Sequence, residues 1–159
     1  MNNLTNKEVV RSFFETYNTQ DCEAAYKYLS LNYLDHGPPA RNIEDAIKTL
    51  KSTYQSFPDI KVVIDDLIEE NDKVAFRGHF SATHLGEFVG IAPTGAKLEF
   101  EAFEIFKIEN QKIIESWGCW PMQEIFNQIN AAKKKSAINY YSGFAKELYR
   151  GNLRSDKAE

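Results

Sequence analysis

The spacing of the hydrophobic residues changes once along the chain, near residue 60, and this change limits the fold more than any other feature. Before it, apolar residues recur with the period of an amphipathic helix. After it, from Lys61 to Trp120, they form runs rich in β-branched and aromatic residues, which are typical of strands. Helices and strands that occupy separate stretches of a chain predict an α+β domain.

Three helices are predicted in the first part. Thr5 and Glu8 have the spacing of a capping box, so a strong first helix follows them. Asp21 can cap a second, shorter helix, and Asn42 can cap a third that ends before Pro58. The apolar residues expected in the second helix are Ala25, Tyr28 and Leu29.

Four strands are predicted in the second part, as an antiparallel meander with a Gly- and Pro-rich loop in its middle. The expected strands are 61–69, 73–84, 97–109 and 112–120, and a helix is expected at 122–129. A bent sheet over the first helix would leave a cavity between them. We expect one domain over residues 1–130, and a helical extension with a polar tail over 131–159, with Ile138, Tyr141, Phe144 and Leu148 at helical spacing.

Charge and composition exclude several classes of function. The formal net charge is −4 and the sequence pI is about 5.5, so no basic field attracts nucleic acid or an anionic membrane. Neither a signal peptide nor an apolar run of about 18 residues is recognised, which predicts a cytoplasmic protein. Three scattered histidines and two distant cysteines predict no metal site. Aromatic residues make up 13% of the chain, which suits a wide core or a ligand cavity.

The segment from Thr83 to Gly95, Thr-His-Leu-Gly-Glu-Phe-Val-Gly-Ile-Ala-Pro-Thr-Gly, is the most distinctive stretch of the chain. Three shorter segments accompany it: Tyr33-Leu34-Asp35-His36-Gly37, Phe57-Pro58-Asp59 and Lys112-Ile113-Ile114-Glu115-Ser116-Trp117. Taken together and in order, over about residues 5–130, they resemble the SnoaL-like (ester cyclase) branch of the NTF2-like superfamily.

The resemblance implies a cone of strongly curved sheet capped by helices, with a pocket at its wide end and often a homodimer formed through sheet faces. It also implies acid/base chemistry without metal or cofactor on a small hydrophobic molecule. The founding cyclases close a ring in a polyketide ester by an intramolecular aldol reaction. In their pattern an Asp that follows the last-strand Trp looks like the general acid/base. Here Gly118 follows Trp117, so that catalyst is absent.

The replacement base is sought among three residues. Asp35 and His36 are expected at a helix exit near the pocket mouth, where a carboxylate can orient an imidazole for proton abstraction. The alternative is that Asp35 caps the turn before Gly37 and that His36 lies on the surface. Glu104 shares a strand face with apolar residues, and in a pocket its pKa would rise toward neutrality. The alternative for Glu104 is an ion pair at a sheet or dimer interface.

The wall of the pocket is expected to come from aromatic and small polar residues. Gly118 and Trp120 share a strand face, so the missing side chain leaves room beside an aromatic ring; alternatively Gly118 marks a bulge and Trp120 is ordinary core. His84 is expected to fix the loop that follows it. The face that His79 occupies is not decided, and Arg77 is expected in an ion pair. The expected substrate-binding residues are Phe14, Tyr33, His79, His84, Phe106, Ser116, Gly118 and Trp120.

Three hypotheses of function follow. The first is a cofactor-free cyclase, isomerase or aldol-type enzyme that acts on a hydrophobic carbonyl or polyketide-like compound. The second is a non-catalytic protein that binds a small hydrophobic ligand or uses the fold to dimerise. The third is an interaction module that exposes an apolar stripe at Ile138, Tyr141 and Leu148. The first requires Asp35, His36 or Glu104 in the pocket with a perturbed pKa.

Overall fold

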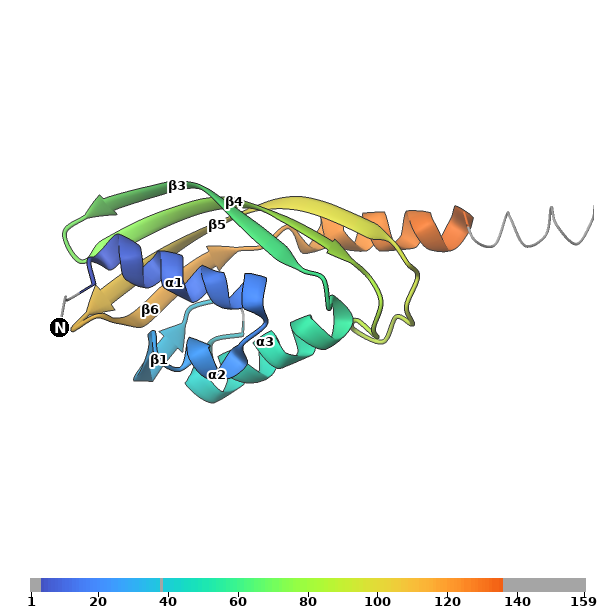
Figure 1. Cartoon of the computed structure of the whole chain (residues 1–159). Coiled ribbons are helices and arrows are strands. Elements are labelled where there is room, and N and C mark those ends of the chain that lie inside the picture. Colours follow the sequence, from blue (N-terminus) through green and yellow to red (C-terminus); the bar gives the residue numbers. More distant parts are fainter. Residues whose placement is uncertain (1–3, 38, 136–159) are drawn as a thin grey trace, which may run out of the picture.

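A computed structural model describes residues 4–37 and 39–135 (Figure 1). One curved sheet of six strands, in the order β2-β1-β6-β5-β4-β3, covers three helices that all lie on its concave side. These three helices are α1 (Asn6–Thr19), α2 (Cys22–Ala25) and α3 (Ile43–Ser56), and a further helix follows β6. The strands are β1 (Leu29–Asp35), β2 (Arg41–Asn42), β3 (Lys61–Glu70), β4 (Lys73–Thr83), β5 (Lys97–Glu109) and β6 (Lys112–Cys119). The α+β cone expected from the sequence is therefore confirmed.

The helices begin where their capping residues predicted. The Thr5 hydroxyl accepts the backbone N–H of Glu8, and the Glu8 carboxylate accepts the backbone N–H of Thr5, which completes the capping box. Asn42 accepts the backbone N–H of Asp45 at 3.0 Å at the start of α3. These side chains satisfy backbone donors that have no partner within the helix, and so they fix where each helix starts.

The first strand was not predicted. The sequence suggested that the second helix extends to Leu29, but α2 ends at Ala25 and Leu29 opens β1. Strand β1 runs parallel to β6, with Leu29 opposite Ile113 and Asp35 opposite Ser116. The backbone carbonyl of Tyr28 accepts the N–H of Ile113 at 2.7 Å. The pairing with a strand far away in the sequence outweighs the local helical spacing.

The alternation of residues along β6 is interrupted. The pairing of β5 with β6 shifts register after Lys107, which is opposite Glu115, whereas the next residue, Ile108, is opposite Ile113. Strict alternation along the strand would place Ile113 on the same face as Glu115, but the side chain of Ile113 is fully buried. A bulge of this kind turns the residues on its two sides to different faces. Beyond it, Ser116 is buried and Trp117 lies on the convex face.

Aromatic rings fill the space between α1 and the sheet. Phe14 stacks on Phe76 with ring centroids 3.8 Å apart, and Phe106 packs edge-on against Phe13 and Phe14. Both Phe14 and Phe106 are completely buried. The sequence predicted both residues on the wall of the cavity described below. They belong instead to the packed core and do not line that cavity.

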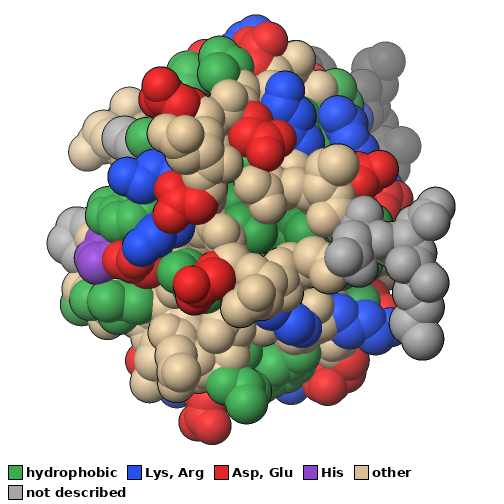
Figure 2. Space-filling view, turned by 90° about the vertical axis from the view of Figure 1, so that its left-hand side faces the viewer, with side chains coloured by type: hydrophobic (Ala, Val, Ile, Leu, Met, Phe, Trp, Pro, Cys, Tyr) green, Lys and Arg blue, Asp and Glu red, His purple; other side chains and the backbone are tan. Residues whose placement is uncertain are grey.

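Residues 122–135 form a helix that continues from the end of β6. Ile125 and Ile129 are its buried residues. This helix crosses the boundary suggested at residues 130 and 131. The predicted stripe of Ile138, Tyr141, Phe144 and Leu148 lies outside the described residues. Within the described residues, no helix has the length and apolar character needed to cross a membrane. On the end of the molecule shown in Figure 2, acidic and basic side chains are intermixed with several separate clusters of hydrophobic side chains.

Candidate active site

A cavity of about 810 Å³ lies between α3, the concave face of the sheet and the loop that follows β4. Its wall is largely apolar and aromatic, and includes Phe13, Tyr17, Phe57, Phe88, Leu98, Phe100 and Trp120. Its polar and charged lining residues include Tyr33, Asp35, Arg41, Lys48 and Glu104. Apolar walls with a few convergent polar groups are typical of sites for small molecules.

Glu104 is a carboxylate on the cavity wall among apolar neighbours. It shares the concave face of β5 with Phe100, Ala102 and Phe106, all of them buried, as the strand alternation predicted. Burial raises the pKa of Glu104 to about 7, and the negative charge of Asp35 acts in the same direction. Ser116, Arg41 and Trp120 oppose the rise without cancelling it. A carboxyl group that titrates near neutral pH can both accept and return a proton.

Gly118 lies directly opposite Glu104 in the pairing of β5 with β6. A Cβ atom at Gly118 would lie 3.2 Å from Cδ of Glu104 and 3.3 Å from Nε1 of Trp120. The carboxyl group of Glu104 therefore fills the space into which a side chain at position 118 would project. Gly118 and Trp120 both line the cavity.

A pair of hydroxyl groups lies beside Glu104. The oxygen atoms of Tyr33 and Ser116 are 2.7 Å apart, and Ser116 is fully buried. Burial raises the pKa of Tyr33, and the charge of Glu104 raises it further. The phenol consequently stays protonated and can donate a hydrogen bond. Of the two, Tyr33 lines the cavity, whereas Ser116 lies behind it and supports Tyr33 and Glu104.

Asp35 lines the cavity, but both of its oxygen atoms are engaged. Oδ1 accepts the backbone N–H of Gly37 at 2.7 Å. Oδ2 accepts Nε–H of Arg41 at 2.9 Å and lies 2.7 Å from Nη2 of the same residue. A carboxylate held in this way orients Arg41 and shapes the turn. Asp35 is therefore not a free base.

His36 lies on the opposite side of the sheet from Asp35, because successive residues of a strand face opposite ways. Its ring stacks on Trp117 at 4.6 Å between centroids, and Nε2 lies 2.8 Å from Glu115. The hydrogen bond with His36, together with one from Lys107, lowers the pKa of Glu115. The carboxylate that contacts His36 is thus Glu115 rather than Asp35, and the pair lies outside the cavity.

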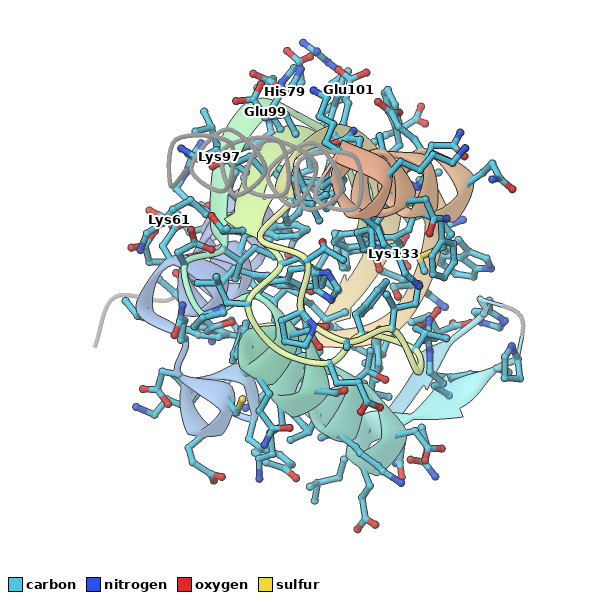
Figure 3. The ribbon with its side chains drawn as sticks, turned by 90° about the vertical axis from the view of Figure 1, so that its right-hand side faces the viewer. Lys61, His79, Lys97, Glu99, Glu101 and Lys133 are labelled. Carbon is cyan, nitrogen blue, oxygen red and sulfur yellow. The ribbon has the colours of Figure 1, made fainter. Side chains whose placement is uncertain are left out.

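His79 also lies on the convex face of the sheet, where Figure 3 shows it beside Glu101 and pointing away from the helices. Its Nδ1 contacts Asp65. One ligand atom from each of Asp65, His79 and Glu101 falls within 4.8 Å of the others, as a metal site requires. However, Nη1 of Arg77 lies 2.7 Å from Glu101 and 3.7 Å from Asp65. The guanidinium already supplies the positive charge, so these residues fit an ion-pair network better than a metal site.

His84 is fully buried beneath the loop that follows β4. Its backbone N–H donates to Ala96 at 2.8 Å, and its Nδ1 lies 3.0 Å from the Thr94 hydroxyl. Burial lowers the pKa of His84, so the ring stays neutral. These contacts position the loop that brings Phe88 to the cavity, and His84 itself does not line it.

Two charged residues of the cavity were not singled out from the sequence. Arg41 lies opposite Asp35 where β1 pairs with β2, and Lys48 lies on α3. Opposite charges on the two sides of the sequence Gly37-Pro38-Pro39-Ala40 were the available signal for Arg41. Lys48 has no comparable signal, because charges on an amphipathic helix usually face solvent.

Residues 7–129 match the family described as SnoaL-like polyketide cyclase. Solved structures with similar folds include AclR from Streptomyces galilaeus, described as a candidate hydroxylase, which is 24% identical with a TM-score of 0.73 over 79% of this chain and 84% of that chain. IdmH from Streptomyces antibioticus, described as a candidate polyketide cyclase, is 22% identical with a TM-score of 0.72, over 80% of this chain and 99% of that chain. At these identities the likenesses concern the fold. No curated protein matches the chain.

Proposed function

The chain belongs to the SnoaL-like polyketide cyclase family, and on that premise we propose that it is an enzyme whose base is Glu104 and whose substrate is a small hydrophobic carbonyl compound. The observation that carries the proposal is the carboxyl group of Glu104 on the wall of a largely apolar cavity, with its pKa raised to about 7. Desolvation of this kind makes a carboxylate a usable base at neutral pH.

The position of Glu104 supplies what the family resemblance leaves missing. The Asp expected after Trp117 is Gly118, and Glu104 occupies the adjoining space from the neighbouring strand. A carboxylate can therefore act at the same place in the cavity although it comes from β5 instead of β6. We infer that the base of this enzyme is Glu104 on β5, the residue paired with Gly118, instead of a residue at position 118 on β6.

The chemistry that these groups support begins with proton transfer from carbon. The Glu104 carboxylate takes a proton from the carbon next to the substrate's carbonyl, and the electron pair of that C–H bond moves to give an enolate. The enolate carbon then attacks a second carbonyl carbon and closes a ring, or takes a proton back at another position and gives an isomer. The proton on Glu104 returns to the product in either case, so the enzyme is restored.

Tyr33 can hold the enolate oxygen while it carries the charge. Its hydroxyl lines the cavity, and once Glu104 is protonated Ser116 is free to donate to Tyr33 at 2.7 Å, so that the Tyr33 O–H can donate to the enolate oxygen. Donors that are fixed before the reaction stabilise developing charge without reorganisation. This arrangement supports a cyclase, aldol or isomerase reaction.

We also propose that two copies of the chain associate through the convex face of the sheet. An apolar band crosses four adjacent strands there, because Ile68 pairs with Ala75, Ala75 with Ile105, and Ile105 with Trp117. Ile68, Ile105 and Trp117 are exposed by 67%, 44% and 37%. An exposed apolar band of this kind is typical of an interaction surface. Analytical ultracentrifugation tests this proposal. We expect the unchanged protein to sediment as a dimer and the Ile105→Glu variant to sediment as a monomer.

The test of the proposed chemistry is the exchange of carbon-bound hydrogen in D₂O, followed by NMR with 2-tetralone as a model ketone. Glu104→Gln keeps the shape of the side chain and removes the base, so the exchange rate should fall by about 10²- to 10⁴-fold. Glu115→Gln, on the convex face, is the matched control and should retain the rate. Equal rates for Glu104→Gln and the unchanged protein would contradict the proposal. Binding of 2-tetralone without exchange in any form would favour a ligand-binding protein.

A further inference from the structure

Arg41 is held rigidly at the cavity wall. It lies opposite Asp35 across the β1–β2 pair, and Oδ2 of Asp35 receives both Nε and Nη2. The turn is built around this contact, because a Cβ atom at Gly37 would lie 3.0 Å from Oδ1 of Asp35 and 3.1 Å from Nη2 of Arg41. The Arg41 side chain is 33% exposed and that of Asp35 is 13% exposed, so the pair is partly withdrawn from water.

Part of the guanidinium remains available. An arginine side chain carries five N–H donors; Nε–H donates to Asp35, and Nη2 lies 2.7 Å from the same carboxylate oxygen. Within residues 4–37 and 39–135, the remaining donors have no protein acceptor. Because Arg41 is one of the residues that line the cavity, an oxygen atom of a ligand can reach them from inside it. Charge-assisted hydrogen bonds from arginine to a carboxylate are among the stronger polar contacts in proteins.

The charges of the cavity favour an anion. Its charged lining residues are Asp35, Arg41, Lys48 and Glu104. Asp35 and Arg41 offset each other, and the raised pKa leaves Glu104 partly neutral at pH 7. With Lys48 included, these four residues therefore carry a small net positive charge at pH 7. The remainder of the wall is apolar, so a complementary ligand has an apolar body and a negative group.

We propose that Arg41 is an anion-binding residue of this cavity, and that its ligand is an aromatic or other apolar compound that carries a carboxylate. Asp35 acts as the positioning residue that fixes the guanidinium. This inference rests on the proposed function for the cavity, and it specifies the class of substrate: the carbonyl compound that reaches Glu104 bears an acidic group that binds at Arg41. The selectivity for acids and the chemistry at Glu104 can be measured separately.

The experiment compares 2-naphthoate with its neutral analogue 2-naphthamide by isothermal titration calorimetry, at low salt and at about pH 6, where naphthoate is ionised and Glu104 is mostly protonated. The unchanged protein should bind the acid about 10- to 100-fold more tightly than the amide, as expected for a hydrogen-bonded charge pair. Arg41→Met should bind both equally, and Arg41→Lys should keep part of the preference, since lysine has the charge without the fork.

Two further variants keep the test decisive. Arg11→Met removes an exposed charge from α1 and should keep the full preference for the acid. Asp35→Ala keeps the Arg41 charge but removes the acceptor that positions the guanidinium, so the preference for the acid should fall, although by less than in Arg41→Met. An unchanged preference in Asp35→Ala would show that Asp35 does not position Arg41. Amide binding by Arg41→Met shows whether that variant retains the cavity. Equal affinity for acid and amide in the unchanged protein, or a preference that survives in Arg41→Met, would overturn the inference.

The same titrations separate this inference from the proposed function. Glu104→Gln should lose hydrogen exchange but keep the preference for naphthoate, because it leaves Arg41 in place. A preference that depends on Arg41 while exchange survives in Glu104→Gln would refute Glu104 as the base and support the anion site. Exchange that depends on Glu104 without any preference for the acid would refute the anion site alone.

Discussion

Glu104 and Glu115 lie on opposite faces of the sheet, and their pKa values are shifted in opposite directions. Glu115 lies on the convex face, where His36 and Lys107 contact it and lower its pKa. Glu104, on the cavity face of the adjacent strand, is held among apolar groups that raise its pKa to about 7. Charged groups that pair with one another in water keep their charge and do little chemistry. Among the described residues Glu104 has no cation within ion-pair distance, and such a carboxylate in an apolar cavity gains the capacity to transfer a proton.

The largest difference between the faces should appear in stability. Phe106 is completely buried on the cavity face of β5, whereas Phe103 is 48% exposed on the convex face of the same strand. Phe106→Ala should lower the free energy of unfolding by about 3–5 kcal/mol because it leaves a cavity in the core. Phe103→Ala should cost less than about 1 kcal/mol in the monomer. Urea denaturation measures both, and similar losses would contradict this assignment of the two faces.

The next effect concerns the pH dependence of stability. The pKa of Glu104 is raised from 4.5 to about 7 by folding, so the stability that its protonated form contributes is complete below pH 4.5 and is lost as the pH rises through 7. Glu104→Gln has no such loss and should gain up to about 3 kcal/mol over the unchanged protein between pH 4.5 and 8.5. Urea denaturation at a series of pH values measures the gain.

Glu115→Gln should show the opposite trend. Its pKa is lowered in the folded protein, so its contribution is present above the unfolded value and is lost as the pH falls through the folded value. The effect should be small because the group is exposed to solvent. Parallel pH profiles for the two variants would remove the contrast between the faces.

A third test moves the carboxylate between strands. Gly118→Asp in the Glu104→Ala background places an acid where the family pattern expects one, in the space that the Glu104 side chain otherwise fills. We expect hydrogen exchange to recover by about 10- to 100-fold over Glu104→Ala alone, which is part of the contribution of a general base. Gly118→Asn in the same background is the matched control and should not recover. Recovery with Asn would show that shape rather than a base restores the rate.

Much of the fold could be predicted because its signals are local. The caps at Thr5 and Asn42 and the alternation along β5 identify two helices and the buried face of that strand without knowledge of the partners. Strand β1 could not be found in the same way, since its partner β6 is far away in the sequence. The bulge before Glu115 likewise depends on pairing, so the alternation alone misplaced Ile113.

The site was predictable only in part, for a related reason. Alternation placed Glu104 with apolar residues, and these proved to lie on the concave face, where Phe100 and Glu104 line the cavity and Phe106 belongs to the core. It could not decide which face of β4 is concave, and His36 was expected at a helix exit rather than next to a strand, so His79 and His36 were considered for a cavity that neither of them lines. The role of Arg41 depends on its pairing with Asp35 across β1 and β2, neither of which was predicted.

The central claim, that Glu104 titrates near neutral pH inside the cavity, is tested most directly by NMR. The side-chain carboxyl carbons of ¹³C-labelled glutamate would be followed through a pH titration, with Glu104→Gln to assign the resonance. We expect one carboxyl carbon to titrate near pH 7 and to be missing from the Glu104→Gln spectrum. If the resonance lost in that variant titrates near 4.5 or below, the Glu104 carboxyl is not desolvated, and the account of this residue as the base is wrong.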